Sequence, residues 1–109
     1  MKKIVVSIAL LIATNLMADV KAGKAVYQAN CAICHTVNGG KALGPDFNIV
    51  SYRRKKSEIV QYAKDPYSMY KKFGYSANAM PTLPLEDQEF KDVAEYISSL
   101  QPFKEWMKK

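Results

Sequence analysis

The sequence predicts a single helical domain, and two segments together with the chain length indicate it. The clearer segment is 86–100, whose apolar residues recur at helical spacing: Phe90, Val93, Ala94, Ile97 and Leu100. Its first turn is acidic, which the positive end of a helix dipole favours. The other segment is 21–30, which has the composition of a helix apart from Gly23. The 109 residues are enough for one domain, and they contain no βαβ pattern.

The two predicted helices carry complementary features. Gly23 and Tyr27 lie four residues apart and therefore share one face of the first helix. The missing side chain at Gly23 would let another helix approach closely, and Tyr96 and Ile97 are placed to meet that face. An incidental glycine is the alternative interpretation.

The segment between these helices predicts shorter elements. Ser57 is a plausible N-cap for a helix through about Lys64, which Asp65 and Pro66 would stop. Pro66 is expected to open another short turn that ends at Gly74.

Residues 1–18 have the pattern of a secretory signal peptide. Two lysines precede an apolar run from Ile4 to Leu16, and Ala18 ends a tolerable cleavage site before Asp19. The run is shorter than the roughly 20 residues of a membrane-spanning helix, although an uncleaved anchor is the alternative. We therefore expect a mature domain over 19–109, with 101–109 as a tail, in a bacterial periplasm. Loss of Lys2 and Lys3 would reduce the formal net charge from +6 to +4.

The most informative stretch is Cys31-Ala32-Ile33-Cys34-His35, because this spacing attaches a c-type haem. If the first helix runs on to His35, both thiols and the imidazole leave one face and can meet one macrocycle. The thiols would then bond covalently to the haem, and His35 would be the proximal iron ligand. Zinc is a poor alternative, because two cysteines and one histidine do not complete four ligands. A disulfide between Cys31 and Cys34 is possible but leaves His35 unexplained.

Thr36 to Phe47 has the composition of a loop that passes the proximal side of the haem. Pro45 offers a carbonyl without an N–H, so that it can accept a hydrogen bond from Nδ1 of His35 and make this ligand more basic. An ordinary Gly-Pro turn is the alternative.

Two further features concern the rest of the haem. The densest basic run is 51–56, in which Tyr52, Arg53 and Arg54 are candidates for binding the two haem propionates, although most such runs are merely solvated. His35 is the only histidine of the chain, so a thioether is expected as the second axial ligand. Met80 is preferred because Pro81 stiffens its loop. Met69, an open site and a lysine ligand are the rivals, and filling gaps in the core is the alternative for both methionines.

Together, the CAICH motif, Gly44-Pro45, Met80-Pro81 and the last helix with Tyr96 resemble a small monohaem class I c-type cytochrome of the bacterial periplasm. The resemblance covers most of residues 20–100. It implies an all-α fold in which the N- and C-terminal helices cross and short helices and loops surround one covalently bound haem c. It also implies His35 and Met80 as axial ligands. The chain departs from the family in lacking a Ser or Thr cap before the last helix and in its longer aromatic tail.

The resemblance implies an electron carrier rather than an enzyme. The basic mature domain is expected to meet redox partners with acidic patches, such as a dehydrogenase, a cytochrome bc1-type complex, an oxidase or a peroxidase. We expect neither nucleic-acid binding nor a membrane span in the mature form. One alternative is the haem subunit of a periplasmic dehydrogenase that oxidises sulfite or another sulfur compound, docked through Phe103, Trp106 and Met107. Another is a gas-binding haem protein or enzyme with a vacant sixth iron site.

Overall fold

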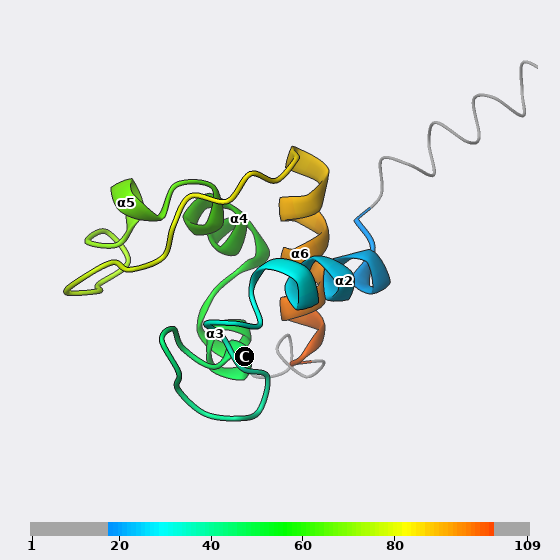
Figure 1. Cartoon of the computed structure of the whole chain (residues 1–109), viewed down its shortest axis with the longest axis horizontal. Coiled ribbons are helices and arrows are strands. Elements are labelled where there is room, and N and C mark those ends of the chain that lie inside the picture. Colours follow the sequence, from blue (N-terminus) through cyan, green and yellow to red (C-terminus); the bar gives the residue numbers. More distant parts are fainter. Residues whose placement is uncertain (1–17, 102–109) are drawn as a thin grey trace, which may run out of the picture.

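A computed structural model describes residues 18–101, and that part of the chain folds into helices joined by loops (Figure 1). The helices are α2 (Val20–Asn30), α3 (Phe47–Arg53), α4 (Lys56–Lys64), α5 (Pro66–Met69) and α6 (Asp87–Ser99). No strand occurs within these residues, which confirms the prediction of an all-α fold. None of the helices described has the length and apolarity needed to cross a membrane. The predicted signal peptide (up to residue 17) and the aromatic residues of the tail lie outside the described residues.

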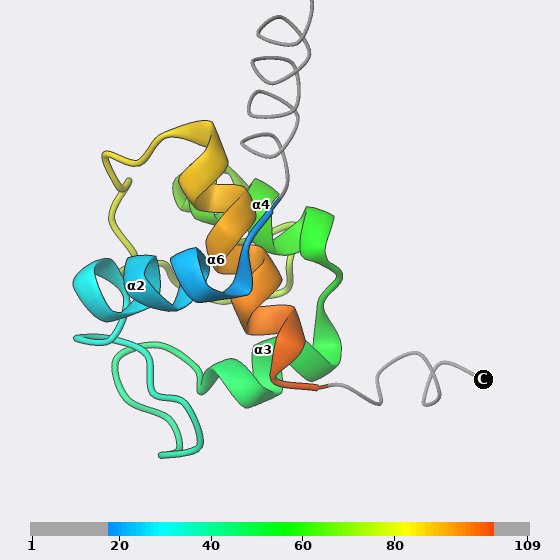
Figure 2. The same ribbon diagram turned by 90° about the vertical axis from the view of Figure 1, so that its right-hand side faces the viewer.

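The first and last helices cross, as predicted (Figure 2). Gly23 sits at the crossing: a Cβ atom there would overlap the carbonyl oxygen of Asp92 and would lie 2.8 Å from Cβ of Tyr96. The rings of Tyr27 and Tyr96 pack beside it with centroids 5.5 Å apart. Gly23 is therefore required by the close approach of two backbones and is not incidental.

The core is built on α6, whose apolar face is buried against the other helices. Its buried apolar side chains are Phe90, Val93, Ala94, Tyr96 and Ile97. The helix starts one residue later and ends one residue earlier than its pattern predicts, so that Glu86 and Leu100 are its caps. In place of a Ser or Thr cap, the carboxylate of Glu89 accepts a hydrogen bond from the N–H of Glu86 (2.9 Å).

The predicted start of the middle helix is wrong by two residues, because the N-cap is Lys55 and not Ser57. Helix α4 begins at Lys56 rather than after Ser57, because the carboxylate of Glu58 accepts the N–H of Lys55 (2.9 Å) and fixes the helix start there. The short turn from Pro66 is confirmed as α5 with proline in its first turn. The turn that follows α5 reaches Gly74, whose φ of 89° suits glycine.

Helix α3 was not predicted. Phe47 was expected to end a loop, and residues 51–53 were expected to belong to a basic run. Asp46 precedes the helix and caps it, because its carboxylate accepts the N–H of Asn48 (2.9 Å). Phe47 and Ser51 are the buried residues of this helix, whereas Tyr52 and Arg53 are exposed. Helix α3 thereby closes the 36–46 loop against α6.

Candidate functional site

The CAICH motif begins where α2 ends. Helix α2 stops at Asn30 because the carbonyl of Tyr27 accepts the N–H groups of both Cys31 (2.8 Å) and Ala32 (3.0 Å), which ends the regular ladder. The helix therefore ends at Asn30, as the composition of 21–30 predicted, and the condition that it runs on to His35 is not met. One further turn nevertheless forms, since the N–H of His35 donates to the carbonyl of Cys31 (2.9 Å). The two cysteines and His35 thus stay within one turn of chain.

The two cysteines are free thiols in different surroundings. Cys31 is buried and packs into the core, whereas Cys34 is half-buried. Burial, with a smaller contribution from neighbouring Cys34, raises the pKa of the Cys31 thiol to about 11. Cys31 is therefore protonated at neutral pH, and the two cysteines do not form a disulfide in this structure.

The imidazole of His35 is held by the loop on its proximal side. Its Nδ1 lies 2.9 Å from the carbonyl oxygen of Pro45, so that the predicted contact is present. A carbonyl can only accept, so Nδ1 carries the proton and the lone pair is on Nε2. Burial lowers the pKa of His35, although the hydrogen bond to Pro45 opposes this effect. Burial, the larger effect, favours the neutral imidazole, and in that form the proton on Nδ1 leaves Nε2 free to bind a metal.

Two residues that flank Pro45 pack on the imidazole. Phe47 stacks on it with ring centroids 4.4 Å apart and planes 23° apart. Gly44 lies so close that a Cβ atom there would overlap Cε1 and would lie 2.7 Å from Nδ1 and 2.8 Å from Nε2 of His35. The N–H of Gly44 also donates to the carbonyl of Cys34 (2.8 Å), which closes the loop onto the motif. The orientation of the imidazole is therefore fixed by 44–47.

Asp46 organises this loop, although no sequence pattern singled it out for the site. Its buried carboxylate accepts backbone N–H groups from Asn38 (3.0 Å), Gly40 (2.8 Å) and Asn48 (2.9 Å). These hydrogen bonds, with that from Asn38 the largest, lower the pKa of Asp46 to about 2. Because Asp46 directly follows Pro45, it holds the carbonyl that His35 needs. An aspartate just before an apolar run was the available signal, since it is a common N-cap.

Met80 lies in the extended segment between α5 and α6, where Asn78 clamps its backbone. The side-chain oxygen of Asn78 accepts the N–H of Met80 (3.1 Å), and its amide nitrogen donates to the carbonyl of Met80 (3.1 Å). The hydroxyl of Tyr62 on α4 donates to the same oxygen of Asn78 (3.4 Å). The backbone of Met80 is therefore positioned, whereas the rival Met69 is part of α5. Sequence patterns did not point to Asn78.

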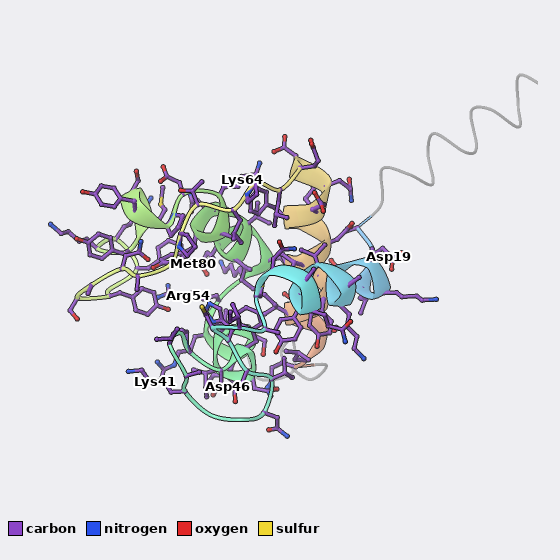
Figure 3. All side chains as sticks on the ribbon, viewed as in Figure 1. Asp19, Lys41, Asp46, Arg54, Lys64 and Met80 are labelled. Carbon is purple, nitrogen blue, oxygen red and sulfur yellow. The ribbon has the colours of Figure 1, made fainter. Side chains whose placement is uncertain are left out.

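Of the three candidates for propionate binding, only Arg54 is half-buried, while Tyr52 and Arg53 are exposed. The Arg54 guanidinium donates to the carbonyl of Phe73 (2.7 Å) and lies 4.5 Å from the centre of that ring. Arg54 thereby connects the end of α3 to the turn after α5, and Figure 3 shows it together with Met80. Arg54 is thus a connecting residue in this structure, and the roles of all three towards propionates stay predictions.

Comparison with known proteins is consistent with this geometry. The family model described as Cytochrome c matches residues 20–101. A cytochrome c-553-like protein of Synechocystis is 31% identical over 85 residues, which cover 78% of this chain and 72% of that protein. Cytochrome c6 of Diacronema lutheri is 32% identical over 83 residues, with coverage of 74% and 95%. The crystal structure of cytochrome c6 from the diatom Phaeodactylum tricornutum superposes with a TM-score of 0.58 at 25% identity, covering 80% of this chain and 99% of that one.

Proposed function

The chain belongs to the cytochrome c family as a small monohaem electron carrier with one covalently bound haem c, and we propose that Cys31 and Cys34 attach the haem while His35 and Met80 ligate its iron. When bound, the haem supplies the chemistry of single-electron transfer by changing between its ferric and ferrous forms. The rest of the proposal concerns what the side chains of this protein do for that group.

The observation that carries the proposal is the fixed imidazole of His35. Its Nδ1 is engaged by the carbonyl of Pro45 at 2.9 Å, so that Nε2 is the nitrogen that can face iron. The same hydrogen bond makes the imidazole a stronger donor, which favours the ferric form. The residues present fit the haem, because both thiols and this imidazole come from one turn, and Gly44 gives the ring space that a Cβ atom would fill.

For the opposite side of the haem we propose the thioether of Met80. Its support is the backbone clamp of Asn78, which keeps the half-buried Met80 at a defined place in a segment without helical hydrogen bonds. Thioether ligation gives a more positive reduction potential than ligation by a second histidine would. Such a potential suits a protein that passes electrons to an acceptor late in a respiratory chain. The proposed propionate partners are Tyr52, Arg53 and Arg54, whose donors suit carboxylates.

We further propose export to the periplasm with cleavage after Ala18. The motif supports this, because attachment of haem c requires thiols outside the reducing cytoplasm. The mature protein would carry a formal charge of +4, which would speed encounters with acidic patches on its redox partners. Electron transfer from such a partner should slow as ionic strength rises.

The iron ligands are tested with Met80→Ala and, as the matched control, Met69→Ala, both in exported holoprotein. Met80→Ala should abolish the weak red absorption band that thioether sulfur gives to ferric haem and should let the ferrous form bind carbon monoxide. Met69→Ala should change neither property. The opposite pattern would assign the sixth ligand to Met69, and carbon monoxide binding by the unchanged protein would show an open site.

Covalent attachment is tested separately on Cys31 and Cys34. Acidified organic solvent should leave the pigment on the unchanged polypeptide, and Cys31→Ala combined with Cys34→Ala should release it or prevent its incorporation. Pigment that washes out of the unchanged protein would refute the proposed attachment.

A further inference from the structure

One buried carboxylate of α6 has no part in the haem site. Oδ1 of Asp92 accepts a hydrogen bond from the backbone nitrogen of Asp19 (3.0 Å), which lies 73 residues away and just before α2. The amide of Gln88 donates to the same oxygen (3.0 Å). Asp92 is only 8% exposed, so that its position at the helix crossing is unusual for a carboxylate. The partner atom is the nitrogen that would be released by cleavage after Ala18.

We propose that Asp92 binds the new amino terminus of the mature protein and thereby holds α2 against α6 after export. A signal peptidase would add water across the peptide bond between Ala18 and Asp19. The hydroxyl group would go to the carbonyl carbon of Ala18 and the hydrogen to the nitrogen of Asp19, which takes up another proton at neutral pH. The neutral donor of the hydrogen bond to Asp92 thereby becomes an ammonium group, and the contact becomes an ion pair. This inference depends on the proposed cleavage site and not on the ligands of the iron.

The geometry selects residue 19 as the terminus. The carbonyl of Asp19 accepts the N–H of Gly23 (2.9 Å), and Gly23 packs against the backbone of Asp92. The first turn of α2 is therefore held at the closest approach of the two helices (Figure 2). A terminus one residue earlier would place the charge about 3.8 Å farther along the chain and leave an amide at Asp19. Only cleavage before Asp19 delivers a charged nitrogen to this carboxylate.

The charge also needs a partner for an independent reason. A positive terminus at the start of a helix is opposed by the helix dipole, and the first turn of α2 contains no acidic residue. The carboxylate of Asp19 is itself engaged as the N-cap, since it accepts the N–H of Lys21 (2.8 Å). Asp92 therefore supplies the negative charge from the other helix. The hydrogen bond to the carboxylate then gains the attraction between opposite charges, so that cleavage tightens this contact.

The test is a double-mutant cycle on exported holoprotein, with the terminus of every sample read from its intact mass. One variant carries an extra alanine before Asp19 in the mature protein, and it is compared with the authentic terminus in unchanged and Asp92→Asn backgrounds. The extra residue should reduce the ratio of folded to unfolded protein by about tenfold when Asp92 is present and by much less when Asp92 is replaced by asparagine. Asp87→Asn is the matched control, because this exposed carboxylate of α6 pairs with Lys64 (2.8 Å) instead.

Equal effects of the extra alanine in both backgrounds would overturn the inference, as would a terminus other than Asp19. If Asp92→Asn does not fold, the unchanged protein decides: the pKa of its unmodified α-amino group, followed through the NMR chemical shifts of Asp19, should lie above the ordinary range of about 7.7–8.0. The carboxylates of Asp92 and of Asp19 itself face this group, and a pKa within or below that range would refute the pairing. The haem spectrum of the same samples reports separately on the proposed function.

Discussion

Gly44→Ala is expected to move the imidazole of His35 without removing any ligand. The added Cβ atom would lie 2.7 Å from Nδ1 and 2.8 Å from Nε2, where ordinary contacts between heavy atoms begin at about 3.5 Å. The ring or the loop must therefore shift by roughly 0.7 Å or more. Overpacking of this kind costs about 1–3 kcal/mol of unfolding free energy. Because Gly44 directly precedes Pro45, the shift should also weaken the hydrogen bond to Nδ1.

The assay measures two quantities on the holoprotein: the free energy of unfolding in denaturant and the reduction potential. A weaker hydrogen bond leaves the imidazole less basic, so the potential should become more positive. Gly39→Ala is the matched control in the same loop, since its Cβ atom would meet only the side chain of Thr36, no closer than 3.1 Å. If Gly44→Ala has the stability and potential of Gly39→Ala, the imidazole is not confined as the structure indicates.

Three further perturbations test other parts of the structure. Gly23→Ala should destabilise the protein by about 1–3 kcal/mol in denaturant unfolding, because the new Cβ atom meets the α6 backbone, and unchanged stability would contradict the close crossing. The pKa of Asp46 is about 2 in the folded protein against an ordinary value of 3.8, so its stabilisation is present above about pH 4 and is lost as the pH falls towards 2. Asp46→Asn should remove the part of the fall in the thermal unfolding midpoint between about pH 4 and pH 2 that is due to Asp46. An unchanged pH dependence in this range would contradict the stabilising role of the Asp46 carboxylate. Asn78→Ala deletes two hydrogen bonds to the backbone of Met80 and should weaken its positioning by about 1–2 kcal/mol. The measurement is the rate of carbon monoxide binding to the ferrous protein, which should increase. Asn30→Ala removes a side-chain hydrogen bond to the carbonyl of Val26 within α2 and should leave this rate unchanged.

The sequence predicted those parts of the fold whose signals are local. The apolar spacing of 86–100 and the glycine at position 23 identified the two crossing helices, because helical periodicity and a missing side chain can both be read from one segment. The hydrogen bond between His35 and Pro45 was one of two interpretations of the Gly-Pro loop that follows the motif, and the structure contains it. These features need no knowledge of distant residues.

The features that were not predicted depend on backbone groups brought together by the loops. Asp46 binds the N–H groups of Asn38 and Gly40 from across its loop, and backbone donors leave no mark in a sequence. Helix α3 was missed for the same reason. Only Phe47 and Ser51 of its residues are buried, and its start depends on the carboxylate of Asp46. The clamp of Asn78 on Met80 likewise consists of side chain to backbone contacts.

The two sides of the proposed haem are supported unequally, and this has a consequence for dynamics. His35 is confined by Gly44, Pro45 and Phe47, a continuous segment that Asp46 fixes to the loop and to α3. Met80 depends on one side-chain amide within 75–86, a segment without helical hydrogen bonds. Few backbone hydrogen bonds and partial exposure characterise the regions of a protein that open first. The methionine side should therefore detach at a lower free energy than the histidine side, so that exchange of the sixth ligand precedes global unfolding.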